Sequence, residues 1–235
     1  MNSSVAKAAH SPQPAAPLQQ FLEDALQDAR FAARIDTAGD ESALNVTLLS
    51  SKTPFDRTVE AADAWLARAG IEATAALNTG YDIVLTLRTQ ASVHQLITVL
   101  LDPHIRAHTT ATQLADLLES HCLFSDVTVH DTHTIEIVLP DDNLRAAVGF
   151  AALLGSPGID GGLALHRPRG MRRLAERIQW LLSGVVASTV RVTAVPGCAH
   201  AADQLTIRMS IDQTRRLAQR LARETPQPRP DLTVA

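Results

Sequence analysis

The chain has 235 residues, of which 46% are hydrophobic and 20% are charged, and its formal net charge is −4. This composition predicts a globular protein with a substantial core and argues against a polybasic chromatin-type protein. Five Phe, two Trp and one Tyr are too few for an aromatic ligand cage or a row of stacked bases.

The cysteine content and the absence of long apolar segments predict the compartment. Cys122 and Cys198 cannot form a disulfide framework, so we expect a reducing, cytoplasmic location. No segment approaches the ~18 uninterrupted apolar residues of a membrane span, and we expect no membrane partner. Residues 1–16 and 224–235 are small, polar and proline-bearing, which predicts disordered tails.

Eight segments have strand character, and short turn-rich stretches join them in pairs. The second member of each pair alternates apolar and polar residues with period two, which predicts a strand with one buried face. The connecting stretches contain Gly, Asn, Asp and Pro, which favour tight reversals. The four predicted hairpins comprise residues 31–37 with 44–48, 71–77 with 83–87, 124–130 with 135–139, and 189–195 with 205–209.

Helical patterns flank every predicted hairpin. Helices with apolar residues at helical spacing lead into the hairpins at residues 18–30, 55–68, 110–120 and 171–182. Helix start signals follow the hairpins at Thr53, Thr89, Asp141 and Ser210 or Asp212. The sequence therefore predicts an α+β fold of four helix-hairpin-helix (αββα-type) repeat units, in which the hairpins form antiparallel sheet and the helices cover one face.

The predicted units divide the chain unevenly. Units 1 and 2 share a helix and occupy residues 17–102, unit 3 occupies 103–155, and unit 4 occupies 169–223. The sequence DPHIRAH at 102–108 is expected to join units 2 and 3. The glycine-containing loop 156–168 is expected to be a flexible connector, because it lacks the lysine and hydroxyl pairing of a phosphate-binding loop. An anion site that the loop forms with Arg167, Arg169 and the start of the following helix is the alternative.

Charge is distributed unequally between the two parts of the chain. Residues 1–165 carry 9 basic and 20 acidic side chains, a net charge of −11, whereas residues 166–235 carry 12 basic and 5 acidic side chains, a net charge of +7. Unit 4 is therefore basic, whereas the part of the chain before it is acidic. Its candidate partner-binding residues are Arg169, Arg172, Arg173, Arg177, Arg191, Arg208, Arg215, Arg216, Arg220 and Arg223.

These arginines have three alternative interpretations. A solvated helix face, in which arginine stems cover apolar surface, requires no partner. Contact with the phosphates of a nucleic acid is the second interpretation. Self-association, in which the basic unit of one chain meets the acidic region of another chain, is the third.

The sequence gives little support for a catalytic site or a metal site. His104 and His108 lack further ligands at recognised spacing, and we predict no metal site and no cofactor. An enzyme would need the fold to bring His130 or His133 close to Cys122, Cys198 or a carboxylate. Trp65 and Trp180 each lie on a predicted helix, and we expect both to pack in the core or between units, with a role in binding as the alternative.

The favoured hypothesis is a non-enzymatic binding or assembly protein whose arginine-rich C-terminal unit contacts an anionic partner. Nucleic acid is the preferred partner because the positive charge is concentrated in residues 166–235. A self-assembling scaffold or a protein-partner scaffold is the alternative, and an enzyme with a His/Cys site is the third hypothesis.

Overall fold

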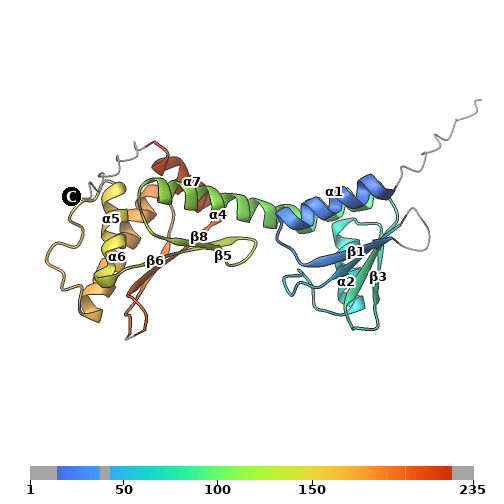
Figure 1. Ribbon diagram of the computed structural model, residues 1–235, viewed down its shortest axis with the longest axis horizontal. Coiled ribbons are helices and arrows are strands. Elements are labelled where there is room, and N and C mark those ends of the chain that lie inside the picture. The colour runs from blue at the N-terminus through green and yellow to red at the C-terminus, as the bar shows by residue number, and fades with distance from the viewer. Residues whose placement is uncertain (1–14, 38–42, 199, 224–235) are drawn as a thin grey trace, which may run out of the picture. The chain divides into compact units, whose positions relative to one another are not determined.

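The computed structural model describes residues 15–37, 43–198 and 200–223, which divide at Ile105 into two compact units (Figure 1). Residues 1–14 and 224–235 of the predicted tails lie outside the described residues. So does most of the predicted turn between the first two strands, at residues 38–42.

The first unit contains a four-stranded antiparallel sheet in the order β1-β2-β4-β3. Both predicted hairpins of this part of the chain are confirmed, and the second strands of the two hairpins pair at the centre of the sheet. Its elements are α1 (Ala15–Asp28), β1 (Ala33–Thr37), β2 (Leu44–Leu48), α2 (Val59–Ala69), β3 (Ala73–Leu77), β4 (Ile83–Leu87), α3 (Gln90–Leu96) and the π-helical turn η1 (Ile97–Leu101).

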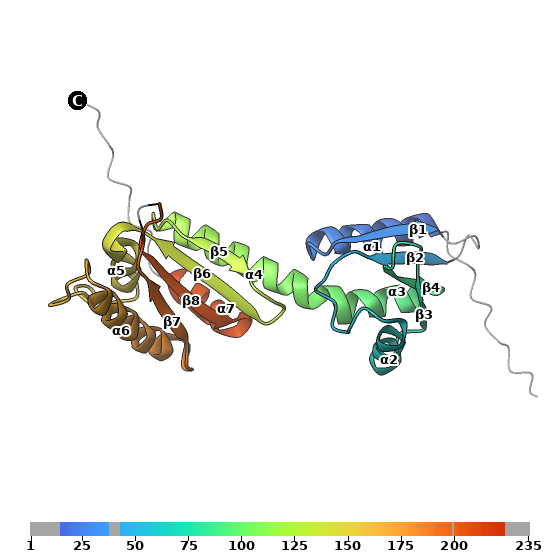
Figure 2. The same cartoon turned by 90° about the horizontal axis from the view of Figure 1, so that it is seen from below.

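The second unit repeats this order of strands, with an antiparallel sheet arranged as β5-β6-β8-β7 (Figure 2). Its elements are α4 (Asp102–Ser120), β5 (Asp126–Val129), β6 (Thr134–Pro140), the 3-10 turn η2 (Asp142–Leu144), α5 (Arg145–Leu153), α6 (Pro168–Val186), β7 (Arg191–Val195), β8 (Gln204–Ser210) and α7 (Ile211–Leu221). The unit boundary falls within α4, whose first residues belong to the first unit.

The predicted fold class is confirmed: the protein is α+β, its sheets are antiparallel, and helices pack against the sheets. The four hairpins combine in pairs, and each pair forms one sheet. In the first unit one helix, α2, lies between the two hairpins, whereas in the second unit α5 and α6 both lie between them. The four-fold repeat remains a prediction.

Each unit has a core of its own between the sheet and the helices. Val46 and Leu85 pair at the centre of the first sheet, as Ile137 and Ile207 do in the second, and all four side chains are fully buried. Their neighbours along each strand face the other side, because side chains alternate across a strand. Burial of side chains of this size contributes about 1.5–3 kcal/mol each.

The segment 102–108, which we expected to be a connection, is helical. α3, η1 and α4 follow each other without a break from Gln90 to Ser120, and Pro103 lies inside this stretch. Proline cannot donate to the carbonyl four residues earlier, and its ring clashes with that carbonyl in a regular helix. The wider π-helical turn directly before Pro103, in which the Asp102 N–H donates to the Ile97 carbonyl, accompanies the passage of the helix through the proline.

The helices that lead into the four hairpins end in the same way. Each is followed by a residue with left-handed backbone: Arg30 (φ 48°), Gly70 (φ 69°), Cys122 (φ 57°) and Ala187 (φ 54°). The next N–H donates to the carbonyl five residues earlier: Phe31 to Leu26 and Ile71 to Leu66 at 3.0 Å, Leu123 to Leu118 at 3.0 Å, and Ser188 to Ser183 at 3.1 Å. This Schellman arrangement turns the chain from helix into strand.

The loop between α5 and α6, which the sequence predicts to be a connector, is packed onto α6. The guanidinium Nη1 of Arg177 donates to the carbonyls of Ile159 at 2.6 Å and Gly161 at 3.1 Å. Leu163 and Leu165 pack against the core of the second unit. The loop thus covers part of α6 and of the core of this unit.

Candidate binding surface

The ten candidate arginines lie on two different faces of the second unit. Arg191 on β7 and Arg208 on β8 are directly opposite each other and are both exposed. They occupy the strand positions that alternate with the inward-facing Val192 and Ile207, so they lie on the face without helices. The Arg208 Nε forms an ion pair with Glu136 on β6.

Two of the helical arginines bind backbone carbonyls within the second unit. Arg177 holds the loop before α6, as described above. The Arg216 Nη1 on α7 donates to the Val186 carbonyl, at 2.8 Å, where α6 ends. Both side chains connect elements of the second unit, which gives them a structural role independent of any partner.

Exposed arginines without an intramolecular partner among the described residues gather on α6. They are Arg169, Arg172 and Arg173 in the first half of the helix. Trp180, in the second half, is 79% exposed, so the expectation that this residue packs against others is wrong. Trp65 does pack: it is 8% exposed, and its ring lies 5.2 Å from that of Phe55.

We call Arg169, Arg172, Arg173 and Trp180 the α6 basic face. Arg169, Arg173 and Trp180 are four and seven residues apart, and this spacing places them on one side of a helix. The buried residues Leu174, Ile178 and Leu182 define the opposite side. At 1.5 Å per residue the three exposed side chains span about 16 Å along the helix. This helical spacing is the signal in the sequence that could have identified Trp180 as exposed.

The predicted arginines of α7 and its end are less uniform. Arg215 approaches Asp212 at 3.7 Å in an exposed pair one turn apart, and Arg220 also has an intramolecular partner. Arg223, the last described residue, is exposed. The α7 arginines therefore do not form a surface as free of internal contacts as the α6 basic face.

The histidines and cysteines considered for catalysis lie apart. Thr134 pairs with Ser210, and Pro140 pairs with Gln204, so the turns before β6 and before β8 lie at opposite ends of the sheet. His130 and His133 are at the first of these turns and Cys198 is at the second. The seven residues of β6 separate them by about 20 Å at normal strand rise.

Cys122 also lies away from the histidine turn. It precedes β5, whose first residue pairs with Val138 near the end of β6, so Cys122 belongs to the same end of the sheet as Cys198. Within the described residues, no three His, Cys, Asp or Glu side chains are close enough together to hold a metal ion.

The surroundings of His104 and of Asp131 shift the pKa of each side chain. Burial lowers the pKa of His104, and the nearby positive charge of Lys52 lowers it further. Partial burial raises the pKa of Asp131, but hydrogen bonds from the His133 N–H, at 2.7 Å, and from Thr134 outweigh it, and the net change is a lowered pKa. Asp131 thereby stabilises the β5–β6 turn.

None of the helices in the described parts of the chain combines the length and the apolar character that crossing a membrane requires. No protein-family model matches the chain, no curated protein matches its sequence, and no solved structure matches its fold.

Proposed function

We propose that the protein binds single-stranded nucleic acid through the α6 basic face. The observation that carries this proposal is the exposed Trp180, which shares one side of α6 with Arg169 and Arg173. A large aromatic ring is seldom left so exposed when it serves the core alone. The positive net charge of residues 166–235 supports an anionic partner.

The chemistry of the face fits a backbone with unpaired bases. Guanidinium groups bind phosphate oxygens in a planar, often bidentate geometry. An indole ring can stack on a base, but only on a base that is not already stacked within a duplex. A single aromatic residue on a face about 16 Å long corresponds to a short contact of a few nucleotides without sequence reading.

Glu176 lies on the same side of α6 as these residues and is exposed. Its carboxylate repels a polyanion, and it therefore weakens binding in this proposal. Removal of its charge should strengthen binding, whereas removal of the arginines should weaken it. This opposite sign makes Glu176→Gln a useful companion variant on the same helix.

The test is fluorescence anisotropy of a labelled oligothymidylate, titrated with the full chain at several salt concentrations. The logarithm of the affinity should fall with the logarithm of the salt concentration at roughly 0.7 per phosphate contacted. The double variant Arg169→Ala/Arg173→Ala should reduce this slope by roughly 1.4. Trp180→Ala should weaken binding by about tenfold, because one stacked base is lost. Oligonucleotide should also quench the fluorescence of Trp180 in the unmodified chain.

Arg88→Ala provides the matched control, because Arg88 is an exposed arginine of the first unit, outside the α6 basic face. This variant should bind as the unmodified chain does. Absence of binding at low salt would overturn the proposal, as would an affinity that is unchanged in the Arg169→Ala/Arg173→Ala variant.

A further inference from the structure

The edge strands of the two sheets are protected unequally. In each unit, a helix side chain accepts a hydrogen bond from an edge amide: Asp63 on α2 from the Ala75 N–H of β3, at 3.0 Å, and Gln179 on α6 from the Val192 N–H of β7, at 3.3 Å. No side chain among the described residues does this for β1, which forms the other edge of the first sheet. Unprotected edge amides are available for pairing with a further strand.

The register of β1 shows which of its backbone groups are available. The Leu49 N–H donates to the Ala32 carbonyl at 3.0 Å, and hydrogen-bonded pairs alternate along an antiparallel ladder. Arg34 and Asp36 therefore direct their backbone groups toward β2. Ala33, Ile35 and Thr37 direct theirs toward the open edge.

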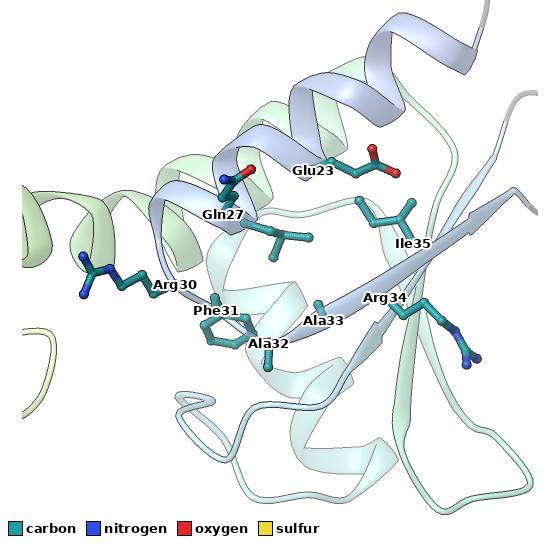
Figure 3. Close-up of a pocket in the computed structure, with 9 residues that line it drawn as sticks. Glu23, Gln27, Arg30, Phe31, Ala32, Ala33, Arg34 and Ile35 are labelled. Atoms are coloured by element: carbon teal, nitrogen blue, oxygen red, sulfur yellow. The ribbon is translucent and has the colours of Figure 1, made fainter.

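A groove lies along this edge, between β1 and the second half of α1. Its volume is about 560 Å³, and Leu26, Phe31, Ala33 and Ile35 contribute its apolar lining. Figure 3 shows Ile35 on the side of β1 that faces α1 and Arg34 pointing away from that helix. The side chains of Ala33 and Ile35 are only half-buried, although they occupy inward-facing positions. The core of the first unit is thus incompletely covered at β1.

We propose that β1 of a second copy of this chain pairs antiparallel with β1 at this edge, with Ile35 of one chain opposite Ile35 of the other. In this register the outward-facing residues meet each other, Ile35 with Ile35 and Ala33 with Thr37, as hydrogen bonding across the edge requires. The two sheets become one continuous sheet across a two-fold axis. The two Ile35 side chains then cover each other on the helix side.

Charge favours a second copy over another strand. In the same register, Arg34 of each chain lies directly opposite Asp36 of the other chain, on the face away from the helices. Within one chain these two side chains already form an exposed ion pair, with 3.0 Å between Arg34 Nε and Asp36 Oδ2. The strand sequence is therefore complementary to itself when two copies run antiparallel.

Sedimentation velocity of the full chain over a range of concentrations tests this proposal, with charge reversal at the two positions. Arg34→Asp places like charges opposite each other in the dimer, and so does Asp36→Arg. Each single variant should weaken dimerisation by about tenfold or more. The double variant Arg34→Asp/Asp36→Arg restores opposite charges and should dimerise within about twofold of the unmodified chain.

Mixing the two single variants separates association from folding. The Arg34→Asp chain is acidic at both positions and the Asp36→Arg chain is basic at both, so a mixed dimer has two favourable pairs. The mixture should associate more tightly than either component alone, and a folding defect would not reproduce this result. Ala33→Pro removes an outward N–H without touching the β1–β2 ladder, and it should also prevent dimerisation while far-UV circular dichroism stays unchanged.

A chain that stays monomeric at all concentrations overturns the proposal and leaves the edge to a different occupant. A dimer that is insensitive to Ala33→Pro and to both charge reversals overturns it equally, as does a mixture of the two single variants that fails to associate.

Discussion

Gly170 and Gly184 on α6 allow a sharp test of how the loop before this helix is packed. A Cβ atom added at Gly170 would overlap the carbonyl oxygen of Ala164 and lie 2.6 Å from its carbonyl carbon. No heavy atom lies within 4 Å of a Cβ added at Gly184. The same substitution to alanine, on the same helix, should therefore have opposite effects at the two positions.

The magnitudes follow from two opposing contributions. Replacing a helical glycine by alanine stabilises the folded state by about 0.5–1 kcal/mol, because alanine loses less backbone entropy. At Gly184 this is the whole effect. At Gly170 the overlap with Ala164 requires a shift of the loop or the helix, and overpacking of this kind costs about 1–3 kcal/mol. Gly170→Ala should therefore be destabilised by up to about 2 kcal/mol, after the gain in helix propensity is subtracted.

Urea unfolding followed by circular dichroism at 222 nm measures both variants. The midpoint should move to lower urea concentration for Gly170→Ala and to higher concentration for Gly184→Ala, with the slope of the transition unchanged. Equal stabilisation of the two variants would refute the close approach of Ala164 to α6. It would also contradict the packing of this loop against α6 and the core of the second unit.

Two further predictions concern helix ends and pH. Ala187→Gly should stabilise the protein by about 1 kcal/mol, because glycine adopts the left-handed cap without strain, and Gly70→Ala should destabilise it by a similar amount in thermal unfolding. Since the pKa of His104 is lowered in the folded state, the unfolded chain binds the proton more readily, and stability should decrease as the pH falls below the ordinary value of 6.5. His104→Leu should weaken this acid dependence between pH 7.5 and 5; an unchanged profile would contradict the assignment.

The strand pairs could be predicted because the second strand of each hairpin alternates apolar and polar residues with period two, but the first strand of each hairpin begins later than its apolar residues suggest. Each first strand of a hairpin was predicted at residue 31, 71, 124 or 189, and each begins two residues later. The difference has one cause. The residues after the helix complete the Schellman cap, and apolar residues such as Phe31 and Ile71 are buried beside that cap. Their apolar character resembles that of a strand, although their backbone reverses the chain.

The sequence does not indicate the helical segment after Leu101, because proline normally ends a helix. A π-helical turn has no simple signature in sequence, so the passage through Pro103 becomes visible only in the backbone. Trp180 is exposed although its residue type favours burial. Its spacing from Arg169 and Arg173 is the feature of the sequence that indicates exposure.

The role of an arginine depends on acceptors that lie far away in sequence, and this limits what a run of charge can predict. Arg177 binds carbonyls 16 and 18 residues earlier, and Arg216 binds a carbonyl 30 residues earlier. None of these three acceptors can be identified from residue type, because every backbone carbonyl is an acceptor and only the fold determines which ones an arginine can reach.

The same reasoning applies to the edges of the sheets. Asp63 and Gln179 protect an edge amide because α2 and α6 each lie beside the strand that follows them. Such a side chain is indistinguishable in sequence from any other polar residue on an exposed helix surface. The open edge of β1 can therefore be recognised only by comparing the edges within the folded chain. The charge complementarity of Arg34 and Asp36 between two antiparallel copies of β1, by contrast, can be recognised from the five residues of the strand once its register is known.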